Sequence, residues 1–342
     1  MTRVAVVGAG IVGLSAAVCI QEHVPDAQVA IFADRQDVAT TSDGAAGIFH
    51  PDCVGADNQA DLKQWIADSA EKYWHAWRTK DPVETGIFEI SGYSVSNHDL
   101  KMVADPVFHE HCRNYRRLEG AELDAVGGGP WRYGAFKTTL ITEPRIMMPD
   151  LFNQFLGNGG QLVQMKLESL APLTSGQWDA IVNCSGLGAR NLVSDHSMYP
   201  IRGQVMRVRA PWMKQFYFGE DDAYILPNAE LVVVGGTRQK NNWSLELCKE
   251  DRDRFVDKCA KMVPGIRETC KEPVREWVGL RPGRPTVRLE EEALAYGTDR
   301  SIPVVHNYGH SGNGIALSWG CGKHVARLVK DIAQREANRP RY

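Results

Sequence analysis

The strongest constraint on the fold of this chain is a glycine pattern close to its N-terminus. Residues Gly8, Ala9, Gly10, Ile11, Val12 and Gly13 fit GxGxxG. The pattern directly follows Val4–Val7, a continuous apolar run typical of a strand covered on both faces. Helical apolar spacing then covers Ile11–Glu22, and Val29–Phe32 is a second short strand-like run. This order predicts a βαβ unit whose glycine turn binds a dinucleotide.

Each glycine of the pattern has a separate physical role. Gly8 allows the tight turn, Gly10 lets a pyrophosphate approach the backbone, and Gly13 lets the helix lie close on the strand. The helix N-terminus offers free N–H groups and partial positive charge to the phosphates. Asp34 lies within one residue of the position where an acidic group holds ribose hydroxyls. The alternative is a glycine-rich turn without a ligand, and the pattern alone does not separate FAD from NAD.

Two further segments favour FAD. The first has small hydroxyl residues at Thr40, Thr41 and Ser42 and continues to Ala46 and Gly47, which suits a ligand running along a loop. The second is the loop His-Ser-Gly-Asn-Gly at 310–314, which opens the last helix of the chain. A second helix N-terminus aimed at the ligand would stabilise the negative charge of a reduced flavin. Each segment alone is also compatible with an ordinary turn.

The middle of the chain alternates between two kinds of region. Residues 56–140 are rich in Trp, Tyr, His and charge, which indicates mixed helix and strand. Strand-like runs follow at Leu162–Leu170 and Ala180–Asn183. Apolar and polar residues alternate over Gly203–Arg209 and Tyr224–Val234, which predicts long strands of an antiparallel sheet.

The end of the chain returns to the character of its beginning. Residues 248–262 predict a charged amphipathic helix, and a strand around Val304 and Val305 precedes the glycine-rich loop and the final helix. The predicted fold class is α/β, with a Rossmann-like FAD-binding domain interleaved with an antiparallel-sheet substrate domain. We assign residues 1–55, 141–195 and 285–342 to the FAD-binding domain, and 56–140 and 196–284 to the substrate-binding domain.

Composition argues against several other classes of function. The net charge is −3 and no block of Lys and Arg occurs, so we expect no nucleic-acid partner. No apolar run approaches the ~20 residues of a membrane span, and the N-terminus enters a strand without a charged leader, so we expect neither membrane insertion nor a secretory signal. The eight cysteines form no CxxC pair and are interpreted as buried free thiols. His109 and His111 are spaced poorly for a zinc-binding helix, and we predict no metal site.

Nearly the whole chain resembles the D-amino acid oxidase family, in particular its D-aspartate oxidase branch. The segments that carry the resemblance keep the family's order and spacing. They are Val6–Ser15, Ala33–Arg35, Asp43–Gly47, Val182–Gly188, Arg202–Val205, Ala210–Trp212, Gly235–Lys240, Val278–Pro282, His306–His310 and Ser318–Gly320. The resemblance implies non-covalent FAD, an interleaved two-domain fold, and oxidation of D-amino acids with hydrogen peroxide as by-product.

The resemblance also implies roles for four residues at the substrate. Arg281 matches the arginine that binds the α-carboxylate, and Tyr224 matches the tyrosine that hydrogen-bonds to the same group. Gly312 lies where a backbone carbonyl receives the substrate amine, and Arg238 matches an arginine typical of the aspartate-preferring branch. With carboxylate and amine both held, the α C–H faces flavin N5, and hydride transfer needs no protein base.

The glycine pattern, the two loops and the resemblance together give the predicted FAD-binding residues. They are Gly8, Ala9, Gly10, Ile11, Val12, Gly13, Asp34, Arg35, Thr40, Thr41, Ser42, Ala46, Gly47, Ser311, Gly312, Gly314, Ile315 and Ala316. The predicted reaction is oxidative deamination of D-aspartate and D-glutamate to 2-oxo acid, ammonia and hydrogen peroxide. The expected partners are a small D-amino acid and O2, and homo-oligomerisation is left open.

The chain departs from the aspartate-preferring pattern at three places. The loop before Tyr224 is acidic at 220–222, where a second substrate-side arginine is often found, so the acidic preference rests on Arg238. Gly312 stands where that branch tends to have serine. The chain ends Arg-Pro-Arg-Tyr342 and not in a Ser-Lys-Leu-like signal, so the expected compartment is peroxisomal or cytoplasmic.

Alternatives remain open at this stage. Arg238 could form a structural salt bridge with the acidic loop 220–222. His50 could line the pocket or be packed beside the flavin, and Cys321 is interpreted as a core residue and not as a covalent flavin link. The competing functions are an oxidase of neutral D-amino acids, a glycine- or sarcosine-type amine oxidase, and a non-catalytic dinucleotide-binding or sensor protein.

Overall fold

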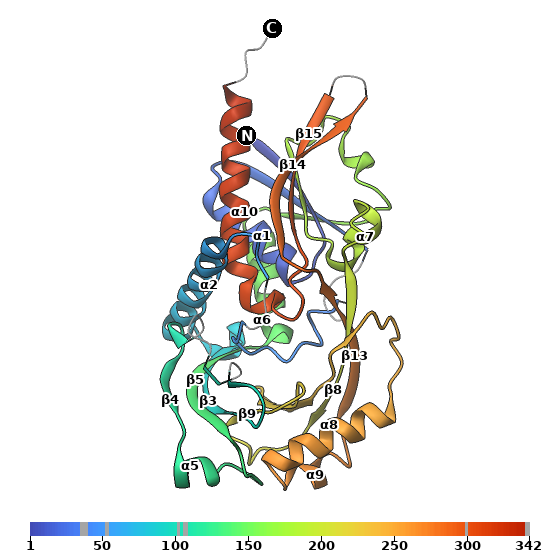
Figure 1. Cartoon of the computed structure of the whole chain (residues 1–342). Helices are drawn as coiled ribbons and strands as arrows, with labels where there is room; N and C mark the ends of the chain where they lie inside the picture. The colour runs from blue at the N-terminus through green and yellow to red at the C-terminus, as the bar shows by residue number, and fades with distance from the viewer. Residues whose placement is uncertain (35–39, 52–54, 101–102, 105–108, 298–299, 339–342) are drawn as a thin grey trace.

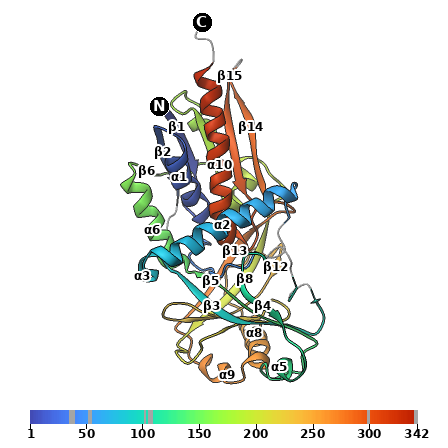
Figure 2. The same ribbon diagram turned by 90° about the vertical axis from the view of Figure 1, so that its left-hand side faces the viewer.

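Two β-sheets, one above the other in Figure 1, organise the computed structural model of this chain. The structure describes residues 1–34, 40–51, 55–100, 103–104, 109–297 and 300–338. The final helix rises along the upper sheet, and the lower sheet carries its own short helices on its outer side (Figure 1). Figure 2, turned by 90°, shows the same division, with α8 and α9 at the end farthest from the C-terminus.

The upper sheet has the strand order β14-β15-β7-β1-β2-β6. Pairing is parallel from β15 to β6, and β14 runs antiparallel to β15. Residues 4–7 are buried, as expected of a strand covered by helices on both faces. The strands are β1 (Thr2–Val7), β2 (Ala27–Ala33), β6 (Gln161–Gln164), β7 (Ala180–Asn183), β14 (Arg288–Tyr296) and β15 (Arg300–Tyr308).

The lower sheet is mainly antiparallel, with the order β12-β8-β11-β10-β9-β3-β5-β4, and β13 pairs with β8. One parallel pair, β3 with β9, joins its two halves. The strands are β3 (Ile87–Ser96), β4 (Arg113–Arg117), β5 (Tyr133–Thr142), β8 (Tyr199–Val208), β9 (Phe216–Phe218), β10 (Tyr224–Pro227), β11 (Val232–Gly235), β12 (Gln239–Lys240) and β13 (Arg275–Gly283).

Helices pack mainly against the upper sheet. The central pair is α1 and α10, which bury small and apolar side chains between them, and α2 lies across α10. The α-helices are α1 (Ile11–His23), α2 (Gln59–Thr79), α3 (Pro82–Thr85), α5 (Gly120–Asp124), α6 (Pro144–Gly157), α7 (Ala189–Leu192), α8 (Lys249–Met262), α9 (Ile266–Thr269) and α10 (Gly314–Ala337). Short 3-10 turns cover η3 (Ala171–Leu173) and η4 (Gly186–Gly188). Within the described residues no helix is both long and apolar enough to cross a membrane.

The predicted fold class is confirmed, because the chain builds the two sheets alternately. Strands of the upper sheet come from residues 2–33, 161–183 and 288–308, and those of the lower sheet from 87–142 and 199–283. The numbered domain limits stay a prediction. Helix α2, which we assigned to the substrate domain, packs against α10 beside the upper sheet (Figure 2).

Two predicted strands are shorter than expected. The run Leu162–Leu170 forms a strand only as β6, and the chain leaves the sheet edge where polar residues begin after Met165. The run Tyr224–Val234 is a hairpin, β10 and β11, closed by a bond from Asn228 N to the carbonyl of Leu231 (2.9 Å). Apolar residues on both sides of the turn continued the alternating pattern, so the pattern did not show where the first strand ends.

The crossing of α10 and α2 depends on a glycine. The amide of Gly320 donates to Ser69 Oγ (2.9 Å), and a β-carbon at 320 would lie 2.1 Å from the carbonyl oxygen of Trp65. The neighbour is backbone, so the two helices would have to separate to admit a methyl group.

We therefore predict that Gly320→Ala lowers the free energy of unfolding by about 1–3 kcal/mol, although alanine favours helix. Gly157→Ala, at the end of α6 with open space around the new methyl, is the matched control and should be neutral or mildly stabilising. Thermal midpoints of the two variants against wild type measure this. An unchanged midpoint for Gly320→Ala would show that the helix contact is not tight.

Candidate active site

The glycine turn after β1 is as compact as its pattern predicts. Gly8 has φ +110°, and a β-carbon there would lie 2.5 Å from the carbonyl oxygen of Cys184. A β-carbon at Gly13 would lie 1.9 Å from the carbonyl oxygen of Gly8. Gly10 is the N-cap of α1 without a side-chain cap, and Ser42 Oγ accepts from the amide of Ile11 (3.2 Å). The first turn of α1 therefore presents backbone amides beside loop 40–47.

A second helix N-terminus lies against the first. Helix α10 starts at Gly314, its N-cap Asn313 makes no side-chain cap bond, and Gly314 lies next to Val12 of α1. Two helix N-termini that meet in this way combine their partial positive charges at one place. Ile315 and Ala316 are buried in the first turn of α10.

Buried polar atoms next to these helix ends have no hydrogen-bond partner among the described residues. They are His310 Nε2 and both polar side-chain atoms of Asn307. Burial lowers the pKa of His310 to about 4, so its ring is neutral at physiological pH. Buried polar groups are normally hydrogen-bonded, so these atoms indicate a polar ligand at the carboxyl edge of the upper sheet.

Loop 40–47 joins the glycine turn to the lower sheet. Thr41 Oγ1 donates to the carbonyl of Leu280 in β13 (3.2 Å), and Asn228 Nδ2 donates to the carbonyl of Ala46 (3.2 Å). Arg207 Nη2 donates to the carbonyls of Gly44 (3.3 Å) and Ala45 (3.2 Å). The loop thus runs from the N-terminus of α1 to the strand that carries the predicted substrate arginine.

The loop before α10 reaches the same strand. The amide of Ser311 donates to the carbonyl of Pro282 in β13 (3.0 Å), and Ser311 has φ +52°. Leu280 and Pro282 therefore accept from the two predicted cofactor loops, one on each side of Arg281. Among the described strands β13 pairs only with β8, so these carbonyls belong to its free edge.

Arg281 is oriented by backbone contacts. Its Nη1 donates to the carbonyl of Thr237 (2.9 Å). A β-carbon at Gly203 would lie 2.4 Å from Nη1, and one at Gly312 would lie 3.7 Å from Arg281 Cδ. The glycine at 203 makes room for the guanidinium, and the glycine at 312 brings the last loop beside the arginine's stem. Arg281 and Gly312 thus lie together, and the substrate roles that the resemblance implies for them stay a prediction.

Tyr224 belongs to the same group. β-carbons at Gly235 and Gly236 would lie 3.1 and 3.0 Å from the Tyr224 hydroxyl, so the end of β11 fits closely around it. Burial raises the pKa of Tyr224, and the nearby Arg281 opposes that rise. The hydroxyl is therefore protonated at neutral pH and is a hydrogen-bond donor next to a guanidinium.

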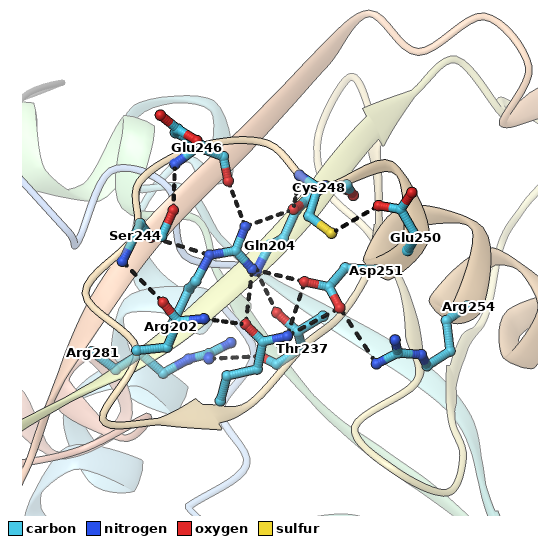
Figure 3. Close-up of polar contacts among 12 residues, drawn as sticks. Arg202, Gln204, Thr237, Ser244, Glu246, Cys248, Glu250, Asp251, Arg254 and Arg281 are labelled. Carbon is cyan, nitrogen blue, oxygen red and sulfur yellow. Dashed lines mark hydrogen bonds and ion pairs between the residues drawn. The ribbon is translucent and has the colours of Figure 1, made fainter.

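A buried polar network around Arg202 adjoins Thr237 (Figure 3). Arg202 is 2% exposed and bonds to Asp251, Gln204 and Gln239, and to the carbonyls of Ser244 and Glu246. The amide of Gln204 donates to Thr237 Oγ1 (2.8 Å), and the Thr237 carbonyl accepts from Arg281. Arg202 and Gln204 belong to a segment that carried the family resemblance, yet sequence reasoning gave them no role.

Arg238 follows Thr237 and forms an ion pair with the acidic loop. Arg238 Nε lies 2.7 Å from Asp222 Oδ1, with side chains 31% and 33% exposed. This contact is the salt bridge that the sequence left open as the alternative for Arg238. Arg238 thus directly follows the residue whose carbonyl accepts from Arg281, and the Asp222 carboxylate is bound to its guanidinium.

His50 lies beside a buried cation. Its Nδ1 is 3.2 Å from Nζ of Lys137, which is 1% exposed, and its ring lies 5.0 Å from that of Phe218. Burial first, and then the Lys137 charge, hold the pKa of His50 well below its usual value. Neutral His50 can accept a hydrogen bond from the Lys137 ammonium. The histidine ring also packs against Phe218, whose ring lies 6.1 Å from that of Tyr224. Sequence reasoning missed Lys137.

Other predicted residues lie farther from this centre. Asp34 is exposed just after β2, at the carboxyl edge of the upper sheet, and Arg35 and Cys53 lie outside the described residues. Cys321 is fully buried in α10, and burial holds its pKa well above the usual value. No disulfide forms among the described cysteines, and no group of three metal-binding side chains gathers in the described part of the chain.

Two helix N-termini facing a shared polar edge, beside an arginine and a tyrosine, define a dinucleotide-dependent oxidoreductase. A family model described as FAD dependent oxidoreductase matches residues 3–328. The chain belongs to this family, in its D-amino acid oxidase group.

Individual relatives agree with this assignment. The chain is 37% identical to the D-aspartate oxidase of Homo sapiens, over 96% of this chain and 95% of that protein. It is 35% identical to the D-amino acid oxidase of Dugesia ryukyuensis, over 96% and 98%. The solved glycine oxidase of Geobacillus kaustophilus superposes with a TM-score of 0.78 at 20% identity, covering 97% of this chain and 95% of that one, and shows the shared fold.

The cofactor is FAD, and the described residues fit it. The α1 N-terminus would offer amides to the pyrophosphate, and the unpartnered polar atoms of Asn307 and His310 lie at the same edge. The α10 N-terminus offers partial positive charge beside Arg281. We assign loops 40–47 and 309–314 to hold the flavin end, because both reach β13 on either side of Arg281.

The buried network yields a stability prediction. Arg202→Met leaves the Asp251 carboxylate without its buried cation, and breaking a buried pair from one side lowers stability by about 3–5 kcal/mol. Arg254→Met is the matched control, because Arg254 also contacts Asp251 (3.3 Å) but is 60% exposed. Its effect should stay within about 1 kcal/mol. Thermal unfolding measures both, and equal losses would contradict the assigned role of Arg202.

Proposed function

We propose that this chain oxidises D-amino acids with O2 and prefers acidic side chains, with D-aspartate and D-glutamate as substrates. The observation that carries the proposal is the grouping of Arg281, Tyr224 and Gly312 between the two cofactor loops. The names of the D-aspartate oxidase and D-amino acid oxidase relatives support the same reading.

Arg281 and Tyr224 bind the substrate α-carboxylate in this proposal. A guanidinium presents two parallel N–H groups to a carboxylate and so fixes its plane. The Tyr224 hydroxyl, kept protonated by its raised pKa, donates a further bond. Thr237 holds the guanidinium from behind through its carbonyl, so the arginine is oriented before substrate arrives.

The substrate amine is received by the Gly312 carbonyl, so the carboxylate and the amine, two substituents of the α-carbon, are held. With the side chain directed toward Arg238 as the third, the C–H bond has one direction left. FAD at this place supplies two-electron acceptance, with O2 as final acceptor and hydrogen peroxide as product. The protein's own contribution is positioning, and only one enantiomer presents its α C–H to the cofactor side. Water then hydrolyses the released imino acid to 2-oxo acid and ammonia.

Arg238 meets the side-chain carboxylate of an acidic substrate. A second carboxylate in a partly dry pocket is costly without a cation, and Arg238 is joined directly to the residue that holds Arg281. An oxidase of neutral D-amino acids, or a glycine-type amine oxidase, is the second candidate, because Asp222 already neutralises Arg238. Peroxisomal or cytoplasmic residence stays a prediction, and homo-oligomerisation stays open.

We predict that Arg281→Ala reduces kcat/KM on every D-amino acid by about a hundredfold or more while FAD stays bound. Losing one partner of a charged contact at the substrate removes about 3 kcal/mol of transition-state stabilisation. Peroxide release gives the rates, and flavin absorbance after gel filtration reports cofactor retention. A variant with FAD bound and wild-type kcat/KM would refute the role of Arg281.

We predict that Arg238→Leu lowers kcat/KM on D-aspartate about tenfold, with a smaller change on D-alanine. Arg238 is partly exposed, so its loss weakens the contact with the side-chain carboxylate less than a buried pair would. The ratio of the two substrates is the measurement, because a destabilised enzyme loses both together. A wild type that prefers D-alanine would favour the neutral-substrate function.

A further inference from the structure

The acidic loop before Tyr224 places a carboxylate where the proposed substrate carboxylate has to bind. Asp222 Oδ1 is 2.7 Å from Arg238 Nε, within the ideal range for a charged hydrogen bond. Both side chains are about one third exposed, so the pair faces the solvent side of the site. Its chemistry, a β-carboxylate on a guanidinium, is the same as that of a bound aspartate side chain.

The loop backbone holds Asp222 in place without help from Arg238. The Asp222 carbonyl accepts from the amide of Gly236 (2.8 Å), and the amide of Ala223 donates to the carbonyl of Glu220 (3.1 Å). Glu220 itself accepts from the backbone amides of Asn97 and His98. Asp222 has φ +62°, a conformation that Asp and Asn tolerate better than most residues. The backbone position of Asp222 is therefore set by the loop, and its side chain starts beside Arg238.

The Asp222 carboxylate also affects Tyr224, which belongs to the proposed substrate site. Burial is the largest cause of the raised pKa of Tyr224; the Arg281 charge lowers this pKa, and the smaller effect of the Asp222 charge raises it. Asp221, the neighbouring acid, lies on Lys258 of α8 (3.1 Å) and is 75% exposed. The two adjacent aspartates thus have different partners, Arg238 for Asp222 and Lys258 for Asp221.

We propose that Asp222 is an internal competitor of the substrate's side-chain carboxylate for Arg238, and so a specificity-determining residue. This inference rests on the proposed function. An acidic substrate has to exchange with Asp222 to reach Arg238, whereas a neutral one makes no such exchange. The chain therefore attenuates its own preference for acidic substrates.

The exchange is energetically accessible. A solvent-exposed ion pair contributes little stability, since water and salt screen both partners and ordering two side chains costs entropy. Replacing one carboxylate by another on the same guanidinium keeps the number of charge-assisted bonds constant. The competition therefore changes the affinity for an acidic substrate by about the free energy of one exposed ion pair, and it leaves the fold intact.

Asp222→Asn tests the competition, and Asp221→Asn is the matched control. Both remove one negative charge from the same turn, and both positions have positive φ, which asparagine accepts. For Asp222→Asn the ratio of KM on D-aspartate to KM on D-alanine should fall about two- to fivefold relative to Asp221→Asn, the range an exposed pair supports. Equal ratios in the two variants would overturn the inference, because they would show that only the loss of one negative charge from the turn matters and not the contact of Asp222 with Arg238. A higher ratio in Asp222→Asn would mean that Asp222 positions Arg238 for the substrate, and would also overturn it.

A double-mutant cycle separates this inference from the proposed function. In an Arg238→Leu background the difference between Asp222→Asn and Asp221→Asn should disappear, and a difference that persists would overturn the competition. Failure of the proposed function appears elsewhere, as a wild type without activity on acidic D-amino acids or an Arg238→Leu variant with unchanged selectivity.

An equilibrium binding measurement tests the inference independently of the rate at which any substrate is oxidised. Succinate carries two carboxylates at the spacing of aspartate and lacks the amine. Calorimetry on the FAD-loaded enzyme should show succinate binding two- to fivefold tighter to Asp222→Asn than to Asp221→Asn, about the worth of an exposed pair. Equal affinities would overturn the inference even in a chain that oxidises no acidic substrate.

Discussion

Two carbonyl groups on the free edge of β13 hold the functional centre together. Leu280 accepts from Thr41 of the first cofactor loop, and Pro282 accepts from Ser311 of the second. An edge strand has backbone groups without a partner strand, and here two loops of the upper sheet satisfy them. Arg281 lies between these anchors, so cofactor loops and substrate arginine are positioned by one strand. Because the chain builds the two sheets alternately, loops that follow strands of the upper sheet reach this strand of the lower sheet.

The centre combines buried and exposed charges with different consequences. Arg202 is surrounded by five acceptors, one of which is the side chain of Gln204. The Gln204 amide in turn donates to Thr237, whose carbonyl orients Arg281. A buried charge that is fully bonded has one arrangement, because every alternative strands a polar group. The Arg238–Asp222 pair is open to solvent and has alternatives. The proposed site for the α-carboxylate is therefore rigid because the charges that support it are buried. The proposed site for the substrate side chain permits exchange because its ion pair is exposed.

The sequence predicted the parts of the site that depend on local backbone requirements. The glycines at 8 and 13 are needed because a β-carbon would meet backbone atoms, and such needs are visible in a short pattern. Arg281, Tyr224 and Gly312 were predicted through resemblance alone, because their neighbours on other strands have no local signature. The Arg202 network was missed because its acceptors are spread over residues 204–251 and two are backbone carbonyls. The turn that splits Tyr224–Val234 was missed because the apolar residues on both sides of it continue the alternation.

The charge on the two arginines explains how a substrate with two carboxylates can be oriented. Arg281 is held by the neutral carbonyl of Thr237 and keeps its full positive charge toward the site. Arg238 is paired with Asp222, so its positive charge is largely offset before any ligand arrives. A dicarboxylate therefore meets one strong and one attenuated anion site, although both are arginines. In the proposed function only binding of the α-carboxylate at Arg281 would bring the amine to Gly312, so this asymmetry would favour the productive orientation over the reversed one. If Asp222 competes for Arg238 as we propose, it would lower the affinity for acidic substrates and at the same time raise the fraction bound in the reactive direction.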